Sequence, residues 1–200
     1  MHGTPTRPAL PIEIVRDMSR LSHLTVPMEE VNTATRITAH AYNQQVVRRL
    51  WFETRPLDSL RLINTLATLQ LFTYCEHQGW VSMPNHGSWS WFELAILTNA
   101  ASIQALKSEA HPQSHESSGL GRIKSREDGS PLRWVSHNIP VPQKKPAHLD
   151  GPLFNADHEL FSCLEVGDPI GVFACAQFGA WRCEGLEGNL KLEQFYEPEP

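Results

Sequence analysis

The amino-acid sequence predicts a mainly β fold: a jelly-roll-like antiparallel β-sandwich that follows a short helical N-terminal segment. Two stretches, 88–97 and 170–178, alternate in side-chain type with a period of two, as strands do. Several other short stretches are rich in Val, Thr and aromatic residues, and polar connections separate them. Six or seven such strands joined by long polar loops are typical of a sandwich or jelly roll.

The bulk composition is that of a globular chain. Of its 200 residues, 40% are hydrophobic and 20% are charged, which fits one domain with a small appendage. A net charge of -5 argues against a large nucleic-acid-binding surface. No apolar run reaches the roughly 18 residues of a membrane span, and the first residues lack the pattern of a signal peptide. We therefore expect a soluble cytoplasmic or nuclear protein, with neither nucleic acid nor membrane as a partner, whose four cysteines are thiols.

Residues 1–45 are predicted to form the helical segment. Apolar side chains recur at helical spacing over about 11–22, and Pro11 suits the first turn of a helix there. Pro27, followed by two glutamates, predicts the start of a second helix that runs to about Tyr42.

Residues 46–200 are predicted to form the sandwich. The segment 46–54 alternates loosely and predicts a strand. The segment 60–75 is rich in Thr and aromatic residues and also favours a strand, although the spacing of its leucines suits a helix as well. The segment 88–97 predicts an interior strand because both of its faces are apolar. We expect one face of it to hold Trp89, Trp91, Ala95 and Leu97, and the other to hold Phe92, Leu94 and Ile96.

The C-terminal half begins with a long predicted loop at 98–131, which is polar and has no periodicity. Later, the sequence Gly-Asp-Pro at 167–169 predicts a tight turn between two strands, in which Asp168 accepts backbone N–H bonds. The strand after it is expected to bury Ile170, Val172 and Ala174 on one face.

Four stretches carry a resemblance to known proteins. They are LPIEIV at 10–15, HQGW…GSWSWFELAI at 77–96, LRWVSH at 132–137 and LEVGDPIGVFACAQFGAW at 164–181. In this order they resemble a group of uncharacterised fungal proteins. In that group an F-box-like helix precedes a jelly-roll domain that is similar to the F-box-associated and galactose-binding-like β-sandwiches. The resemblance covers about 46–197 for the sandwich and a few residues for the helix. It implies the jelly-roll fold and, through the helix, docking on a ubiquitin-ligase core.

Tryptophan is concentrated in 74–96, which holds three of the chain's six indoles. Indoles on strands favour a core, whereas Trp80 and Trp181 follow glycine-containing turns and are expected at strand ends. We place the candidate ligand site at the end of the sandwich that is formed by the connections 76–88 and 178–185. There, indoles would lie beside neutral hydrogen-bonding groups, as sugar or peptide recognition needs. The predicted site residues are His77, Gln78, Trp80, Asn85, His86, Gln177 and Trp181. The alternative is that these indoles plug the end of the sandwich.

Catalytic and metal sites find little support in the sequence. Cys75 and three histidines match no zinc-ligand spacing. The segment around Ser88 lacks the second glycine of a nucleophile elbow. A trio such as Ser90, His137 and Asp168 can be picked from any chain of this length. We therefore predict no catalytic residues, metal or cofactor.

The leading hypothesis is a non-catalytic recognition module that binds a glycan or a protein partner through loops at one end of the β-sandwich. Two alternatives stay open. The first is a substrate adaptor, in which the N-terminal helix docks on a ubiquitin-ligase core and the sandwich presents a substrate. The second is a small enzyme of a fungal metabolic pathway that uses the cavity of the sandwich.

Overall fold

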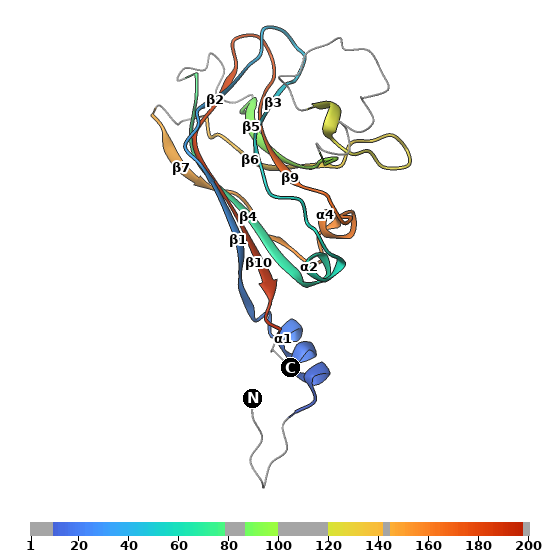
Figure 1. The fold of residues 1–200 in the computed structure, drawn as a ribbon. Helices are drawn as coiled ribbons and strands as arrows, with labels where there is room; N and C mark the ends of the chain where they lie inside the picture. Colours follow the sequence, from blue (N-terminus) through green and yellow to red (C-terminus); the bar gives the residue numbers. More distant parts are fainter. Residues whose placement is uncertain (1–9, 79–86, 100–119, 142–144, 198–200) are drawn as a thin grey trace.

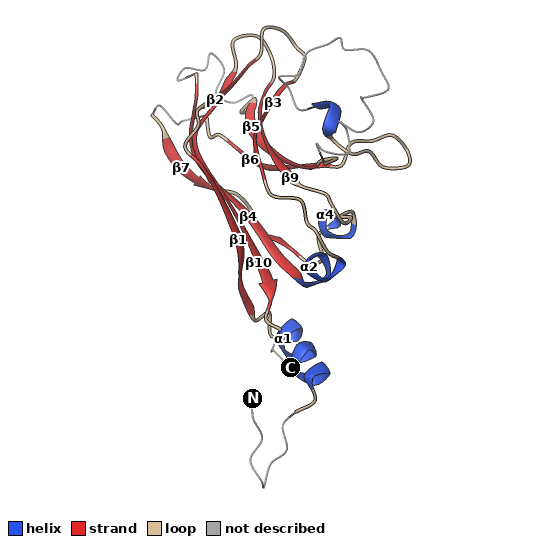
Figure 2. Cartoon of the chain, viewed as in Figure 1, coloured by secondary structure: helices blue, strands red, loops and turns tan. Residues whose placement is uncertain are grey.

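The protein consists of two antiparallel sheets that pack face to face, with a helix at the narrow end of the molecule (Figures 1 and 2). The computed structural model describes residues 10–78, 87–99, 120–141 and 145–197. The helices are α1 (Ile12–Leu21), α2 (Leu60–Thr65), the 3-10 helix η2 (Leu120–Arg122) and α4 (Glu159–Ser162). The strands are β1 (Thr25–Thr33), β2 (Ile37–His40), β3 (Val47–Glu53), β4 (Leu66–His77), β5 (Ser90–Ile96), β6 (Arg133–Asn138), β7 (Ala147–Asp150), β8 (Phe154–Asn155), β9 (Ile170–Ala176) and β10 (Arg182–Phe195). No helix in these ranges is both long enough and apolar enough to cross a lipid bilayer.

The strand order confirms the predicted jelly roll. One sheet has the order β1-β10-β4-β7, with β2 also paired to β10 and β8 to β4, and we call it the β10 sheet. The other has the order β3-β9-β5-β6, and we call it the β9 sheet. The chain crosses repeatedly from one sheet to the other, so strands that are neighbours in a sheet are far apart in the sequence. All strand pairs of the two sheets are antiparallel, as in a double-sheet jelly roll.

The core lies between the two sheets and is organised around Trp51. This indole packs against Phe92 with a centroid distance of 5.5 Å, and its Nε1 donates to the backbone oxygen of Thr35 at 2.6 Å. Two glycines of β10 make room for it. A Cβ atom on Gly185 would lie 2.6 Å from the indole, and one on Gly188 would lie 2.9 Å from it. Only glycine at these positions lets the large ring lie against the backbone of β10.

Both interior strands have the predicted faces. In β9, Ile170, Val172 and Ala174 belong to the core between the sheets, as predicted. The opposite side of β9 belongs to a second apolar cluster on the outer face of the β9 sheet. In β5, Phe92, Leu94 and Ile96 enter the first cluster, whereas Trp91, Ala95 and, directly after the strand, Leu97 enter the second. Trp89, predicted on the same face as Trp91, precedes the strand and packs against Phe178 instead. The predicted role of Asp168 is also confirmed, because its Oδ2 accepts the backbone N–H of Glu165 at 2.9 Å.

The predicted second helix, from Pro27 to Tyr42, is wrong. Residues 25–33 and 37–40 are β1 and β2, and both pair with β10. Pro27 lies in an edge strand beside a β-bulge, where a missing backbone N–H does little harm. Pairing with a distant strand therefore overrode the local helical signal, and residues 25–40 are part of the sandwich. The predicted helix over about 11–22 is confirmed as α1.

Two further segments differ from the predictions. The segment 60–75 begins with a helix, α2, and becomes a strand only at residue 66; Ser59 Oγ caps the helix by accepting the backbone N–H of Leu62. The segment before the Gly-Asp-Pro turn contains the short helix α4 rather than a strand, and His158 Nδ1 caps it. In both cases a polar side chain satisfies the first turn of a helix that is too short to show a period. Residues 100–119 of the predicted loop at 98–131 lie outside the described residues.

Candidate functional site

The predicted site at the end of the sandwich is described only in part, because Trp80, Asn85 and His86 lie outside the described residues. Of the other residues, His77 points inward from β4 and is only 2% exposed. Its Nε2 lies 3.2 Å from the backbone oxygen of Val141, and its ring centroid is 6.1 Å from that of Trp181. The structure therefore brings these two predicted residues together, at the margin of the core.

The other predicted residues at this end also have internal partners. Gln78 Oε1 accepts the backbone N–H of Arg182 at 3.2 Å. Gln177 Nε2 donates to the backbone oxygen of Gln44 at 3.1 Å. The indole of Trp181 is half-buried and packs against the core between the sheets. These contacts agree with the alternative, in which the residues close the end of the sandwich, and ligand contact there stays a prediction.

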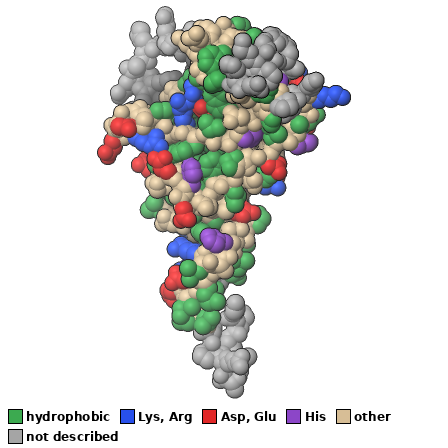
Figure 3. Space-filling view, turned by 180° about the vertical axis from the view of Figure 1, so that it is seen from behind, with side chains coloured by type: hydrophobic (Ala, Val, Ile, Leu, Met, Phe, Trp, Pro, Cys, Tyr) green, Lys and Arg blue, Asp and Glu red, His purple; other side chains and the backbone are tan. Residues whose placement is uncertain are grey.

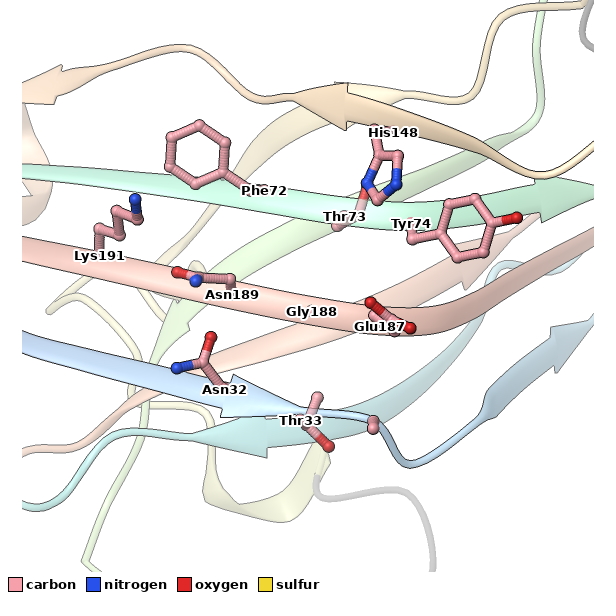
Figure 4. A pocket seen from close by; sticks show the side chains of 11 residues that line it. Asn32, Thr33, Phe72, Thr73, Tyr74, His148, Glu187, Gly188, Asn189 and Lys191 are labelled. Carbon is pink, nitrogen blue, oxygen red and sulfur yellow. The ribbon is translucent and has the colours of Figure 1, made fainter.

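A groove crosses the outer face of the β10 sheet, and sequence reasoning did not find it (Figure 4). Its volume is about 490 Å³, within the ~300–1,000 Å³ range of small-molecule sites. Four strand regions contribute, since the lining includes side chains from β1, β10, β4 and β7 and from the turn after β1. The lining residues are Asn32, Thr33, Ala34, Phe72, Thr73, Tyr74, His148, Glu187, Gly188, Asn189 and Lys191.

Aromatic rings line one side of this groove. Along β4 the burial alternates strictly, so that odd-numbered residues from Leu69 onward are buried and even-numbered residues face outward. Phe72 and Tyr74 are consecutive on that outward row and are half-buried. Tyr74 stacks on His148 of β7 with a centroid distance of 4.6 Å and an interplanar angle of 27°. The ammonium of Lys191 lies 5.1 Å from the centroid of Phe72.

Polar side chains line the other side of the groove. Figure 4 shows Glu187, Asn189 and Lys191 rising from β10, which pairs with β4, and Asn32 rising from β1 on the far side of β10. The amide of Asn189 donates to a carboxylate oxygen of Glu30, which fixes its orientation. The groove therefore offers amide, carboxylate and ammonium groups beside a row of rings.

Only part of this groove could be predicted from the sequence. The outward row of β4 combines polar residues with two aromatic residues at positions i and i+2, and strict alternation over the segment from 68 to 76 could have identified it. His148 and Asn189 could not have been assigned to the same face, because their neighbours depend on which distant strands pair with β4.

Cys75 and Cys183 are buried thiols, and His137 is a half-buried histidine that lies between two hydroxyl groups. Burial raises the pKa of Cys75 to about 11 and raises that of Cys183 further, so both thiols are protonated at neutral pH and are poor nucleophiles. His137 lies between Ser136 Oγ, 3.0 Å from its Nδ1, and Thr73 Oγ1, 2.9 Å from its Nε2. Burial lowers the pKa of His137 to about 4, against a weaker opposing effect of Asp150.

The trio weighed in the sequence is not assembled. Ser90 Oγ donates to the backbone oxygen of Arg182, and Asp168 forms an ion pair with Lys124 at 3.0 Å, while His137 has the partners given above. Among the described residues, no group of three or more His, Cys, Asp or Glu side chains has the geometry to hold a metal ion.

A second hollow, of about 340 Å³, lies on the β9 sheet beside Arg48, Glu93 and Arg133. Glu93 is nearly buried, and its carboxylate accepts from both guanidinium groups, with Arg48 Nε at 2.8 Å and Arg133 Nη1 at 3.1 Å. The indole of Trp91 donates to the same carboxylate at 2.8 Å. The carboxylate is thus saturated by its own chain, and this hollow offers a ligand less than the groove does.

Comparison with known proteins adds little. No protein-family model matches the chain, and no curated protein matches it. Among solved structures, the chain is similar to a chain of a structure titled Desmodium yellow mottle tymovirus, with 9% sequence identity over 87% of this chain and 93% of that chain. The TM-score of 0.18 is too low to bear on fold or function.

Proposed function

We propose that this protein is a non-catalytic recognition module that binds a glycan in the groove on the outer face of the β10 sheet. One observation carries the proposal: a row of half-exposed rings lies beside a row of amide and charged groups in an open groove. The proposal keeps the class of function expected from the sequence and moves the site from the end of the sandwich to the face of one sheet. The adaptor and enzyme hypotheses stay predictions.

The chemistry of the groove is complementary to a sugar. A pyranose ring has an apolar face of C–H groups and an edge of hydroxyl groups. Phe72, Tyr74 and His148 offer flat surfaces for the apolar face. Asn32, Glu187 and Lys191 offer acceptors and donors for the hydroxyl edge.

The groove favours binding over glycosidic bond cleavage. Glycosidases generally place two carboxylates on either side of the scissile bond. Of the described residues that line the groove, Glu187 alone is acidic. A second carboxylate, Glu30, is held by Asn189 and does not line the groove.

A glycan array followed by calorimetry tests this proposal. We expect the wild-type protein to bind a defined set of short oligosaccharides, and Tyr74→Ala to reduce the affinity by about tenfold or more, which corresponds to about 1.4 kcal/mol of binding free energy. Because Tyr74 faces outward, the variant should keep a melting temperature within a few degrees of the wild type.

Tyr42→Ala is the matched control. Like Tyr74, Tyr42 has its ring beside a histidine, 4.5 Å from His40; it is exposed and does not line the groove. Its removal should leave glycan binding unchanged. Equal losses in Tyr42→Ala and Tyr74→Ala, or no glycan bound by the wild type at millimolar concentration, would refute the proposal.

A further inference from the structure

The Glu187 carboxylate has no hydrogen-bond or ion-pair partner within the described part of the chain. The other two glutamates of β10 do have partners. Glu184 is buried and forms ion pairs with two arginines, and Glu193 accepts hydrogen bonds from two threonine hydroxyl groups. Glu187 is exposed and lines the groove, so its charge is available to a ligand.

Two rings lie beside this carboxylate, at one end of the groove (Figure 4). Tyr74 is directly opposite Glu187 where β4 pairs with β10, and His148 is directly opposite Tyr74 where β4 pairs with β7. Side chains in such positions on one face of a sheet have Cβ atoms about 4.5–5.5 Å apart. A carboxylate with aromatic rings beside it binds an ammonium group well, because the ion pair and the cation–π attraction act together.

The charges that border the groove also favour a cation over an anion. Asp150 of β7 is opposite Phe72, and it is exposed. Glu30 of β1 is opposite Lys191 and is exposed as well, so each edge of the groove has a carboxylate. Lys191 is the only Lys or Arg among the described residues of the lining, and its ammonium lies 5.1 Å from the Phe72 centroid at the other end of the groove. A sugar acid would therefore meet more negative than positive charge.

A strongly acidic glycan also fits the rest of the molecule less well. On the face drawn in Figure 3, Lys and Arg side chains are interspersed with Asp and Glu and do not gather into a basic patch. The net charge of the chain is -5. Because like charges repel one another at low salt, this surface would repel an acidic polysaccharide and attract a basic one.

We infer that the groove binds a glycan that carries a free ammonium group, as an unacetylated amino sugar does, and that Glu187 recognises this group. The inference rests on the proposed function, because it takes the groove to be the sugar site. The ammonium donates a charge-assisted hydrogen bond to the carboxylate, while the C–H face of the same sugar packs on Tyr74. An acetamido group in its place is neutral, and a hydroxyl group keeps a hydrogen bond without the ion pair. The groove is open to solvent, so we expect a selectivity of about five- to tenfold.

Calorimetry of the whole chain with trisaccharides of chitosan, chitin and cellulose tests the inference at neutral pH and low salt. These sugars share one linkage and differ only in the group on the second ring carbon, which is an ammonium, an acetamido or a hydroxyl group. We expect the wild type to bind the chitosan trisaccharide about five- to tenfold more tightly than either of the others. Added salt should reduce the difference, because it screens the ion pair. Trilysine, which has ammonium groups but no sugar ring, should bind about tenfold more weakly than the chitosan trisaccharide.

Glu187→Gln removes the charge and should abolish the selectivity. We expect its affinity for the chitosan trisaccharide to fall about five- to tenfold and that for the cellulose trisaccharide to fall about twofold at most. Lys191→Gln removes the positive charge of the lining and should raise the selectivity about twofold. Glu127→Gln is the matched control, because Glu127 is also exposed but lies in a turn and does not line the groove; it should keep the wild-type selectivity. Thermal unfolding checks that each variant is folded.

Failure of the inference can be told from failure of the proposed function. A wild type that binds none of the trisaccharides and no other glycan on the array refutes both. A wild type that binds glycans on the array without preferring the chitosan trisaccharide, or that binds trilysine as tightly, overturns the inference alone. The same conclusion follows if the selectivity survives Glu187→Gln, or if Glu127→Gln abolishes it to the same extent.

Discussion

The outer faces of the two sheets differ in what covers them. On the β9 sheet the outward residues Phe173, Cys175 and Leu97 are 0% exposed. On the β10 sheet the outward residues Phe72 and Tyr74 are half-exposed and line a groove. Both faces contain aromatic residues, so the aromatic content alone does not distinguish a ligand surface from a core. The difference lies in whether the chain supplies its own cover.

The β9 face is closed by apolar contacts and by a saturated ionic cluster. Ile123 packs on the apolar cluster and forms a β-bridge with Leu97, and Val46 and Leu50 pack on it as well. At one side of the cluster, Glu93 receives hydrogen bonds from two arginines and an indole. A face whose polar groups already have partners is stabilising and leaves little for a ligand to satisfy. The β10 face has exposed polar groups beside its rings, and it is the face on which we propose that a ligand binds.

The largest difference in stability is expected between alanine variants of two phenylalanines, one on each outer face. Phe173→Ala removes a fully buried ring on the covered face and should lower the free energy of unfolding by about 3–5 kcal/mol. Phe72→Ala removes the same atoms from the open face and should cost about 1 kcal/mol or less, since that ring is already half-exposed. Denaturant unfolding of both variants measures the two values.

Substitution of the same two phenylalanines by aspartate gives a sharper test. Phe173→Asp should abolish cooperative folding, because it buries an unpaired charge, whereas Phe72→Asp should fold. Equal losses of stability for the two alanine variants would mean that both outer faces are covered to the same extent.

These two faces also show how far the sequence could lead. Strands β5 and β9 are apolar on both sides, and this pattern predicted strands buried on both faces, as the structure has them. The jelly-roll class followed from such strands and from their polar connections. By contrast, β1 has no strong alternation, and its conformation is set by pairing with β10, about 160 residues away along the chain.

The groove could be predicted less well than the fold. It needs β1, β10, β4 and β7 as neighbours in that order, and a local pattern does not contain this order. The site was therefore predicted at the end of the sandwich, from indoles that lie near turns. In the structure, Trp181 packs on the core at that end. The same limit explains why the central indole was not identified: Trp51 fits only because two glycines of β10 lie opposite it.

The second prediction compares two glutamates. Glu93→Gln leaves Arg48 and Arg133 without their shared anion and should lower the free energy of unfolding by about 2–3 kcal/mol; this is less than for a fully buried pair, because both guanidinium groups are partly exposed. Glu187→Gln on the open face should change it by less than about 0.5 kcal/mol. Thermal and denaturant unfolding at pH 7 measure both. A cost below 1 kcal/mol for Glu93→Gln would show that the ionic cluster does not help to close the β9 face.

The smallest expected effect is a loss of stability at acid pH, and it distinguishes two histidines. At neutral pH it is absent. His137 is half-buried and points between the two sheets, beside Phe92, whereas His148 lies on the open face. Burial lowers the pKa of His137 from 6.5 to about 4, so the unfolded chain binds this proton more readily than the folded chain does. The free energy of unfolding therefore has its full value above pH 6.5, where the ring is neutral in both states. It falls progressively as the pH falls towards 4. By linkage, the loss at pH 5 is about 2 kcal/mol.

The hydrogen bonds of His137 support the neutral ring. Thr73 donates its hydroxyl hydrogen to Cys75 Sγ, so it accepts from the Nε2–H group of His137, and Nδ1 then accepts from Ser136. A second proton on the ring would require the Ser136 hydroxyl to turn and accept from Nδ1–H instead of donating to it. We expect the stability of His137→Gln to fall less between pH 7 and pH 5 than that of the wild type, by about 2 kcal/mol. His148→Gln removes a histidine from the open face and is the matched control. An equally shallow fall in both variants, or an NMR titration in which the His137 ring gains its proton near pH 6.5, would contradict the assignment of this acid sensitivity to the interior of the sandwich.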